Sequence, residues 1–399
     1  MPVSRRHFFL GSLAVSRLAA KKPAPPRPSV LLVLVDELPG WMLGACGNKE
    51  VRTPAIDRLA QTGTRFTNHF AASPDAASSR ATLLTGRTPM QVGDAGTISG
   101  ADVALDKLLG GLGYVCHATS AQTSADVTAD AVKFLDQQTA DKNFLLTVHY
   151  TDLRAPYDGT PKKFTDLYTS QMFDNYAQDK PAANAREGRE MLGDTVAGLA
   201  KAAAAISALD DQIGAVTAKL YQKQLMDSTM IVFTPTCGAL FGRHGLWGAG
   251  RASDPVNMYD EVVNTPMILS WPRRVPPQLV QVEMVSAYDL VPTLSEFANA
   301  EPPDRNLCGR SYLLLATGQK LPKKQRWRTT VYGHFQNTDM AREDGYKVVI
   351  RDGGKGLNEL YDIPADRVEK VNQYNNAQYV DVKNRLTAQI TAWKQKYSA

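Results

Sequence analysis

The stretch SVLLVLVDE, residues 29–37, is an uninterrupted apolar run that ends on two acids. A run of this length without polar alternation is typical of a parallel strand that is buried on both faces of a sheet. In open α/β sheets, ligands bind just beyond the carboxyl ends of such strands. We therefore expect a central strand here, with Asp36 and Glu37 at the edge of the sheet where chemistry gathers.

Further strands and helices alternate along the chain on either side of this run. The helix at 53–63 has Thr53 as its expected cap and Pro54 in its first turn. Strand-like runs lie at 64–70, 114–120, 143–152, 228–236 and 265–271, and further helical patterns lie at 101–113 and 199–224. This order predicts an α/β sandwich with a mainly parallel central sheet.

The pattern changes from residue 311 onward. Short strand-like segments follow one another closely at 329–335, 344–352 and 358–363, and the segment 377–397 has the pattern of a helix. We therefore expect a large α/β domain over residues 28–310 and a small C-terminal α+β subdomain over residues 311–399.

The first 27 residues differ from the rest. Arg5 and Arg6 precede a short apolar run, which resembles a twin-arginine export signal, and a proline-rich linker follows. The alternative is a basic amphipathic helix. The run is shorter than the about 20 apolar residues that span a bilayer. We expect a periplasmic or secreted protein without a stable membrane span beyond the signal.

Composition and charge exclude some classes of function. The chain has 399 residues, 21% of them charged, and a net charge of +5. It has no basic stripe with interleaved aromatic residues, which argues against nucleic-acid binding. The four cysteines lack metal-site spacing, so buried free thiols are expected, although three disulfide pairings stay open for an exported chain. They are Cys46, Cys116, Cys237 and Cys308.

The stretch SPDAASSRATLLTGR, residues 73–87, has the pattern of an anion-binding turn. A small polar loop runs into Arg80 and then into an apolar helical start, so backbone N–H groups and a guanidinium would face an anion. Alanines occupy the start of that helix, so it offers no side-chain nucleophile there.

Several stretches in one order resemble the sulfatases of the alkaline phosphatase superfamily. They are LVDELPGWMLGACGN (34–48), SSRATLLTGR (78–87), ISALDDQIG (206–214), MIVFTPTCGALFGRHGLWG (230–248) and VSAYDLVPTLSEFA (285–298). The resemblance covers nearly all of the chain after the signal. It implies the fold of that family and a calcium-assisted hydrolysis of sulfate esters.

The resemblance also implies a nucleophile that this chain lacks. The family carries a cysteine or serine, converted to formylglycine, at the position of Ala76, four residues before Arg80. Alanine has no heteroatom to oxidise, so formylglycine cannot form at Ala76 and covalent catalysis has no nucleophile there. We expect Ser78 and Ser79 to cap or solvate the helix start instead.

The metal ligands implied by the resemblance are half retained. Asp36 and Glu37 stand at the first pair of ligand positions, whereas Thr236 and Cys237 replace the Asp and the Asn or His of the second pair. This is a poor donor set for calcium. We expect no cofactor, or calcium if any metal remains. A zinc site of Asp36, Cys237 and His244 is the alternative.

The other catalytic positions implied by the resemblance are also altered. Ala121 and Thr123 stand where the family has a Lys and a His, Arg154 where it has a His, and Ala249 where it has a Lys. His244 lies near the place of a pocket loop. We expect one or both of Arg80 and Arg154 to pair with the two acids in place of a metal ion, because adjacent buried carboxylates need a counter-charge. The alternative is that Arg154 is a solvated loop residue.

The residues therefore predict an exported sulfatase homologue that does not use formylglycine and that binds an anionic or sulfated glycan, or a protein partner. One alternative is an active hydrolase of sulfate or phosphate esters with a rearranged site. Another is a structural partner of an active sulfatase. His117 and His149 are expected to be packed core residues.

Overall fold

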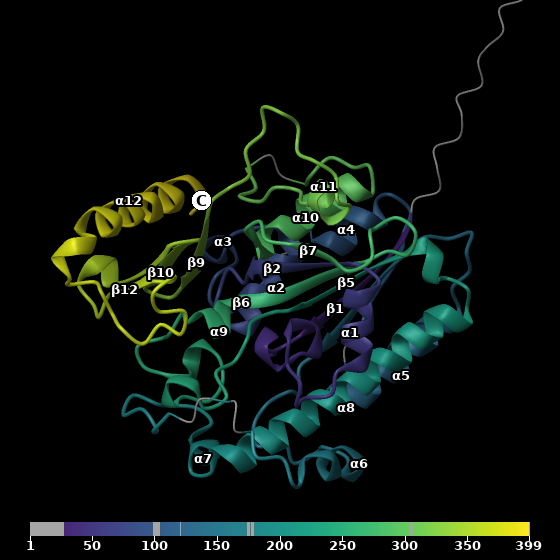
Figure 1. Cartoon of the computed structure of the whole chain (residues 1–399). Coiled ribbons are helices and arrows are strands. Elements are labelled where there is room, and N and C mark those ends of the chain that lie inside the picture. Colours follow the sequence, from purple (N-terminus) through teal and green to yellow (C-terminus); the bar gives the residue numbers. More distant parts are fainter. Residues whose placement is uncertain are drawn as a thin grey trace, which may run out of the picture.

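The computed structural model of the chain describes residues 28–98, 104–119, 121–173, 176, 179–303 and 306–398. A large α/β unit carries a smaller sheet and a C-terminal helix on one side (Figure 1). The predicted export signal at residues 1–27 lies outside the described residues. Among the residues that the structure describes, no helix combines the length and apolar character needed to cross a bilayer.

The large unit is built on an eight-stranded sheet with the order β3-β4-β1-β5-β6-β2-β7, and β8 pairs with β2. The strands are β1 (Ser29–Val35), β2 (Thr64–Phe70), β3 (Val115–Ala118), β4 (Phe144–Tyr150), β5 (Thr229–Pro235), β6 (Asn264–Ser270), β7 (Leu279–Gln281) and β8 (Val285–Ser286). Only β6 runs antiparallel to its neighbours β5 and β2. The expected mainly parallel sheet is therefore confirmed.

Strand β1 lies in the middle of the sheet, as its continuous apolar run predicts. Leu31, Val33 and Val35 pack into the hydrophobic core on one face, and the alternate residues pack into the core on the other. In the parallel register, Val35 lies opposite Tyr150 of β4 and Pro235 of β5. The carboxyl ends of these three strands therefore meet at one edge of the sheet.

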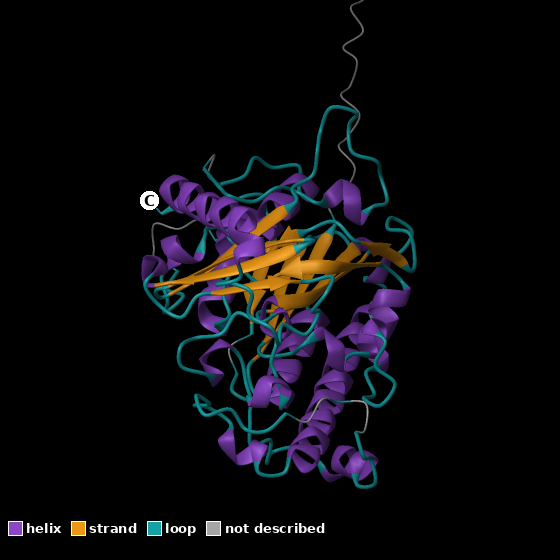
Figure 2. Cartoon of the chain, turned by 60° about the vertical axis from the view of Figure 1, so that its left-hand side comes forward, coloured by secondary structure: helices purple, strands orange, loops and turns teal. Residues whose placement is uncertain are grey.

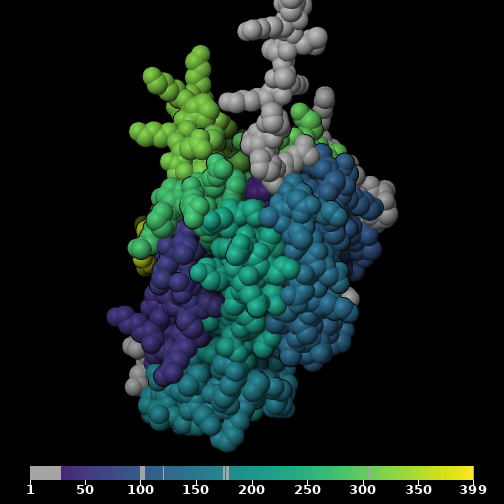
Figure 3. Space-filling view, turned by 90° about the vertical axis from the view of Figure 1, so that its right-hand side faces the viewer, coloured from purple at the N-terminus to yellow at the C-terminus, as the bar shows by residue number. Residues whose placement is uncertain are grey.

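Helices cover both faces of the large sheet (Figures 1 and 2). One face carries α1 (Pro54–Gln61), α5 (Ser124–Asp136) and α8 (Thr195–Gln222), and the other carries α4 (Leu105–Gly110), α10 (Leu290–Phe297) and α11 (Leu313–Ala316). Helices α5 and α8 pack side by side on the face seen in Figure 3. Helix α2 (Ala76–Thr85) contacts α10. The remaining helices are short: α3 (Pro89–Val92), α6 (Lys162–Thr165), α7 (Arg189–Leu192) and α9 (Asp260–Val263).

The cap of α1 differs from the expectation. The Thr53 side chain makes no capping hydrogen bond to this helix. Instead, the carboxylate of Asp210, on α8, accepts hydrogen bonds from the Ala55 N–H at 2.9 Å and the Ile56 N–H at 2.8 Å. A charged acceptor that takes two of the free N–H groups satisfies the helix start, and it also ties α1 to α8.

The smaller sheet is antiparallel with the order β12-β11-β10-β9, and α12 (Val380–Tyr397) packs on it. Its strands are β9 (Thr330–Phe335), β10 (Thr338–Glu343), β11 (Tyr346–Arg351) and β12 (Glu359–Asp362). Strand β10 was not predicted, because TDMARE carries three charges. Its buried Asp339 pairs with His334 and Lys394, and its buried Arg342 pairs with Asp260.

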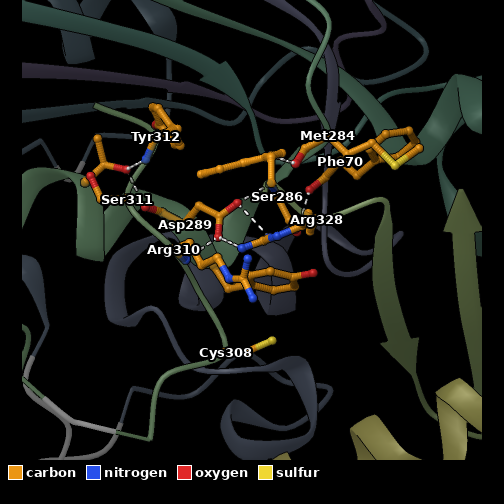
Figure 4. Close-up of polar contacts among 12 residues, drawn as sticks. Phe70, Met284, Ser286, Asp289, Cys308, Arg310, Ser311, Tyr312 and Arg328 are labelled. Atoms are coloured by element: carbon orange, nitrogen blue, oxygen red, sulfur yellow. Dashed lines mark hydrogen bonds and ion pairs between the residues drawn. The ribbon is translucent and has the colours of Figure 1, made fainter. Parts of the chain in front are cut away.

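A buried ion pair between Asp289 and Arg328 holds together the two ends of the segment that connects the two sheets (Figure 4). Asp289 receives hydrogen bonds from both terminal nitrogens of Arg328, at 2.8 and 2.7 Å, and from the backbone N–H groups of Ser286 and Arg310. Every oxygen of this fully buried carboxylate is therefore used. Helix α11, within the same connection, packs in the core of the large sheet.

All four cysteines are free thiols in the structure. Only Cys237 is buried, whereas Cys46 is exposed and Cys116 and Cys308 are partly exposed. The expectation of buried thiols is therefore wrong for three of the four. Cys46 follows a short turn after Leu43 at the surface, which leaves its side chain open to solvent.

Candidate functional site

The candidate site lies where β1, β4 and β5 end. Asp36 and Glu37 follow β1, Thr236 and Cys237 follow β5, and His149 is the last residue but one of β4. The backbone keeps these ends together, since the Thr236 N–H donates to the Val35 carbonyl at 2.8 Å. The sheet topology therefore brings the predicted metal-ligand positions to one place.

Asp36 is buried and uses both carboxylate oxygens within the chain. His149 Nε2 lies 2.8 Å from Asp36 Oδ1, and the Thr236 hydroxyl donates to the same oxygen at 2.8 Å. Arg154 Nη2 lies 3.5 Å from Oδ2. Burial alone would raise the pKa of Asp36, but His149, Thr236 and Arg154 together lower it below its usual value. Asp36 is therefore an ionised group with its own partners.

Glu37 shares Arg154 with Asp36. Arg154 Nε lies 3.6 Å from Glu37 Oε1, so one guanidinium contacts both acids. Burial, together with the neighbouring acids Asp36, Glu187 and Asp75, raises the pKa of Glu37 to about 7 against the opposing charge of Arg154. Glu37 also has a left-handed φ of 56°, which is strained for a residue with a side chain. The expected pairing of an arginine with the two acids is thus found for Arg154.

Arg80 does not take part in that pairing. No hydrogen bond or ion pair links its side chain to another residue in the part of the chain that the structure describes. Arg80 is a partly buried residue on the second turn of α2. A partly buried cation without an internal partner is a candidate for contact with an anion.

The start of α2 is occupied by the chain itself. Ala76 is the first residue of the helix, and the carboxylate of Asp75 accepts hydrogen bonds from the Ala77 N–H at 3.1 Å and the Ser78 N–H at 3.3 Å. The second oxygen of Asp75 lies 2.8 Å from Arg251 Nε. A carboxylate therefore lies where the helix dipole and free N–H groups would attract an anion.

The expectation for Ser78 and Ser79 needs correction. Both side chains are fully buried, and neither hydroxyl has a hydrogen-bond partner among the described residues. Asp75 takes the capping role, because its carboxylate reaches the N–H groups of the first turn. The two serines neither cap the helix nor face solvent.

Ala249 lies close to this helix start. The next residue, Gly250, donates its N–H to the Pro74 carbonyl at 3.0 Å, and a Cβ at Gly250 would lie 2.6 Å from the Pro74 Cβ. Only glycine allows this close approach of the two backbones. The loop also passes Glu37, since a Cβ at Gly248 would lie 3.9 Å from Glu37 Oε2.

A cavity of about 490 Å³ lies beside Arg154. The Arg154 side chain is 57% exposed and lines it together with Thr123, Tyr157, Phe164 and Gln212. The cavity thus combines one cation, two acids, uncharged polar groups and two aromatic rings. Thr123 is also the cap of α5, where its hydroxyl accepts a hydrogen bond from the Asp126 N–H. Ala121 packs against the hydrophobic core.

The histidines do not all lie where the sequence indicated. His149 is a site residue rather than a packed core residue, because its ring contacts Asp36. His117 is about one third exposed on the edge strand β3, where it pairs with Asp130 at 3.0 Å. His244 is stacked on Tyr259, and its Nε2 lies 3.6 Å from Glu261 Oε2. The position of His149 opposite Leu34, near the end of β1, is the signal that could have identified it.

The side chains present do not fit the calcium ion implied by the resemblance. Asp36 already accepts from His149 and Thr236, and Arg154 lies against Asp36 Oδ2 and Glu37 Oε1. Burial raises the pKa of the Cys237 thiol well above its usual value, so the thiol stays protonated and is a poor ligand. Within the described ranges, no three His, Cys, Asp or Glu side chains are arranged as a metal site.

Comparison with known proteins identifies the family. Residues 28–300 match the family model described as sulfatase, and residues 248–396 match the model described as N-sulphoglucosamine sulphohydrolase, C-terminal. The first of these models covers more than half of the chain, and the second includes the smaller sheet and α12. The two models overlap over residues 248–300, which include Ala249.

Individual relatives agree with the family models. An ulvan-active sulfatase of Formosa agariphila is 22% identical to this chain. The alignment covers 70% of this chain and 63% of that protein. An N-acetylglucosamine-6-O-sulfatase of Bacteroides thetaiotaomicron is 21% identical over 97% of this chain and 90% of its own length. A solved structure in complex with its substrate D-glucosamine-2-N,6-O-disulfate has a TM-score of 0.78 at 21% identity, covering 93% of this chain and 98% of that one. The chain therefore belongs to the sulfatase family.

Proposed function

We propose that this protein binds an anionic, sulfated glycan and does not hydrolyse its ester by the formylglycine route. The observation that carries this proposal is Ala76 as the first residue of α2, at the position of the family's nucleophile. A methyl group cannot attack sulfur, and no maturation enzyme can turn it into an aldehyde. The active-hydrolase alternative lacks a comparable observation in its favour.

The surroundings of Ala76 support the same proposal. Proton transfer to a leaving alcohol needs a side chain that can give up its proton near neutral pH. Arg154 stands at the family's histidine position and cannot do so. Ala121 and Ala249, at the two lysine positions, cannot hold the sulfate oxygens.

Two arginines and one cavity support an anionic glycan as the ligand. Arg80 has a guanidinium without a partner in the described part of the chain, and the 490 Å³ cavity is lined by Arg154 and two aromatic rings as well as by two acids. Guanidinium groups recognise sulfate-like oxygens well, and aromatic rings pack against apolar sugar faces. The relatives named above are sulfatases whose names refer to ulvan and to an amino sugar.

The first test is turnover. Purified protein is assayed against aryl sulfates, sulfated sugars and phosphate esters, each with calcium, magnesium, manganese or zinc. We expect no hydrolysis above that of a heat-treated sample. Turnover that disappears with Asp36→Asn or Arg80→Ala would establish the active-hydrolase alternative instead.

The second test is binding of sulfated saccharides by calorimetry, with desulfated versions as controls for charge. We expect binding of the sulfated form and its loss in Arg80→Ala. The exposed Arg58, on α1, provides the control variant Arg58→Ala, which should bind as the wild type does. Failure of the wild-type protein to bind any sulfated saccharide would favour the third reading, a structural partner of an active sulfatase.

We also propose export through the twin-arginine-type signal, which places the mature protein in the periplasm or outside the cell. The paired Arg5 and Arg6 before a short apolar run support this proposal. The test is cell fractionation of the full chain. The change Arg5→Lys/Arg6→Lys should retain the protein in the cytoplasm, whereas unchanged distribution would argue against this signal.

A further inference from the structure

The divalent-cation position of this site contains a cationic side chain of the chain itself. Arg154 reaches Asp36 with Nη2 at 3.5 Å and Glu37 with Nε at 3.6 Å, so a single guanidinium spans the two adjacent carboxylates. Adjacent buried carboxylates repel each other unless a positive charge lies between or beside them. Arg154 supplies that charge from the loop after β4.

Asp75, a further acid near Glu37, also has its charge balanced within the chain. Asp75 is held by the first N–H groups of α2 and by Arg251 at 2.8 Å. His149 and Thr236 complete the hydrogen bonds of Asp36. Each of these three carboxylates therefore has partners within the chain.

The positions that would complete a metal shell offer little to a hard cation. The Thr236 hydroxyl is already used as a donor to Asp36, and the Cys237 thiol is fully buried and protonated. Hard divalent ions require several oxygen ligands, most of them charged or carbonyl oxygens. A metal ion would have to displace Arg154, and no three His, Cys, Asp or Glu side chains among the described residues are arranged to hold it.

We propose that Arg154 is the resident cation of this site and that the folded protein neither requires nor selects a divalent metal ion. The guanidinium performs the electrostatic role of an ion without its Lewis acidity. This proposal concerns stability and ion content, so it does not depend on which ligand the protein binds.

The test compares thermal unfolding of full-length variants with and without millimolar calcium and with a chelator. The wild-type melting temperature should be the same in all three conditions, and the isolated protein should contain no stoichiometric metal by mass spectrometry. Arg154→Met should lower the melting temperature by several degrees, and calcium should recover part of that loss. Arg154→Lys, which keeps the charge, should stay indifferent to calcium.

A matched control is available in the smaller sheet. Arg385 is 46% exposed and pairs with Glu343, which is 17% exposed, values close to those of Arg154 and Glu37. Arg385→Met should lose some stability but gain no response to calcium. The proposal is overturned if calcium stabilises the wild type, if a chelator destabilises it, or if Arg154→Met responds to calcium no more than Arg385→Met does.

A second variant covers the case in which Arg154→Met does not fold. The double change Arg154→Met/Glu37→Gln removes the cation together with one of the two charges it balances. It should fold and show no calcium response. If both variants fail to fold, the wild-type titration and metal content decide the question. Absence of glycan binding or presence of turnover would contradict the proposed function and leave these measurements untouched.

Discussion

The Asp75 carboxylate and the Arg251 guanidinium lie 2.8 Å apart at the start of the helix that begins with Ala76. Asp75 also accepts hydrogen bonds from two N–H groups of that helix. The Asp75 carboxylate thus interacts with the positive end of the helix dipole. At a helix start without such a carboxylate, that position is available to an external anion. The Asp75 side chain alone therefore prevents an external sulfate from binding at the start of α2.

Removal of that carboxylate is therefore expected to create an anion site. In Asp75→Ser, the serine can still cap the helix, so the free energy of unfolding should fall by only about 1 kcal/mol. Arg251, and the N–H group of Ala77 or Ser78 that the serine does not use, would then be free for an anion. We expect inorganic sulfate to raise the melting temperature of this variant more than that of the wild type, in which Asp75 occupies the helix start.

Helix α8 offers the matched control for this prediction. Its cap, Asp194, accepts a hydrogen bond from the Ala197 N–H at 3.0 Å, and the side chain is exposed. Asp194→Ser makes the same chemical change at a helix start outside the site. Equal responses of the two variants to sulfate would show that the effect is not specific to the start of α2.

A second prediction concerns the missing nucleophile. Ala76→Cys, produced together with a formylglycine-generating enzyme, should not hydrolyse aryl sulfates. Arg154 still lies against the two acids, and Thr236 and Cys237 still provide no metal shell. The measurement combines mass spectrometry of the residue at position 76 with a rate assay. Rapid turnover from this single change would mean that the other losses matter little.

The features that the sequence predicts best are those set by residues close to one another along the chain. Strand β1 follows from an apolar run that only a sheet buried on both faces accommodates, and α8 follows from its helical periodicity. The places of Ala76, Thr236 and Cys237 in stretches that resemble family motifs identify them as departures from the family's residues. The capping acid of α1 could not be found in this way, because Asp210 lies 155 residues after Ala55.

The same limit applies to the site and to the smaller sheet. The sequence pattern around His149 predicts a packed core residue, and only the register of β1 and β4 places it beside Asp36. Strand β10 has too many charges for a strand pattern, and its partners come from β9, α12 and α9. Charges that are satisfied by distant segments carry no local signal, so a tertiary structure was needed to interpret them.

A third prediction concerns the buried ion pair of Asp289 and Arg328. Arg328→Met leaves a fully buried carboxylate without its bidentate partner, and we expect a loss of about 3–5 kcal/mol in the free energy of unfolding. Chemical denaturation monitored by tryptophan fluorescence measures this loss. The double change Asp289→Asn/Arg328→Met should recover part of it, because no unpaired charge remains.

The exposed pair of Arg273 and Asp227 provides the comparison for this prediction. Their side chains lie 3.1 Å apart and are 82% and 55% exposed. Arg273→Met should cost at most about 1 kcal/mol, because water screens such a pair. If Arg328→Met costs no more than Arg273→Met, the buried pair does not fasten the connection between the sheets.

The last prediction is a pH dependence set by Asp210. Burial raises the pKa of this carboxylate from 3.8 to about 6, against the opposing hydrogen bonds from Ala55 and Ile56. The folded protein therefore holds the proton more tightly than the unfolded chain does. The contribution of this proton to stability is complete below pH 4 and is lost as the pH rises through 6, a change of about 3 kcal/mol.

Asp210→Asn removes this titration and keeps one acceptor for the α1 cap. As the pH rises from 4 to 7, the unfolding free energy of the wild type should fall relative to that of Asp210→Asn. The neighbouring Asp211, which is exposed and pairs with Lys163 at 3.1 Å, supplies the control variant Asp211→Asn. A constant difference between wild type and Asp210→Asn across this range would show that the buried carboxylate is ionised throughout. The cap of α1 would then depend on the charge of Asp210 and not on the hydrogen-bonding capacity of a neutral acid.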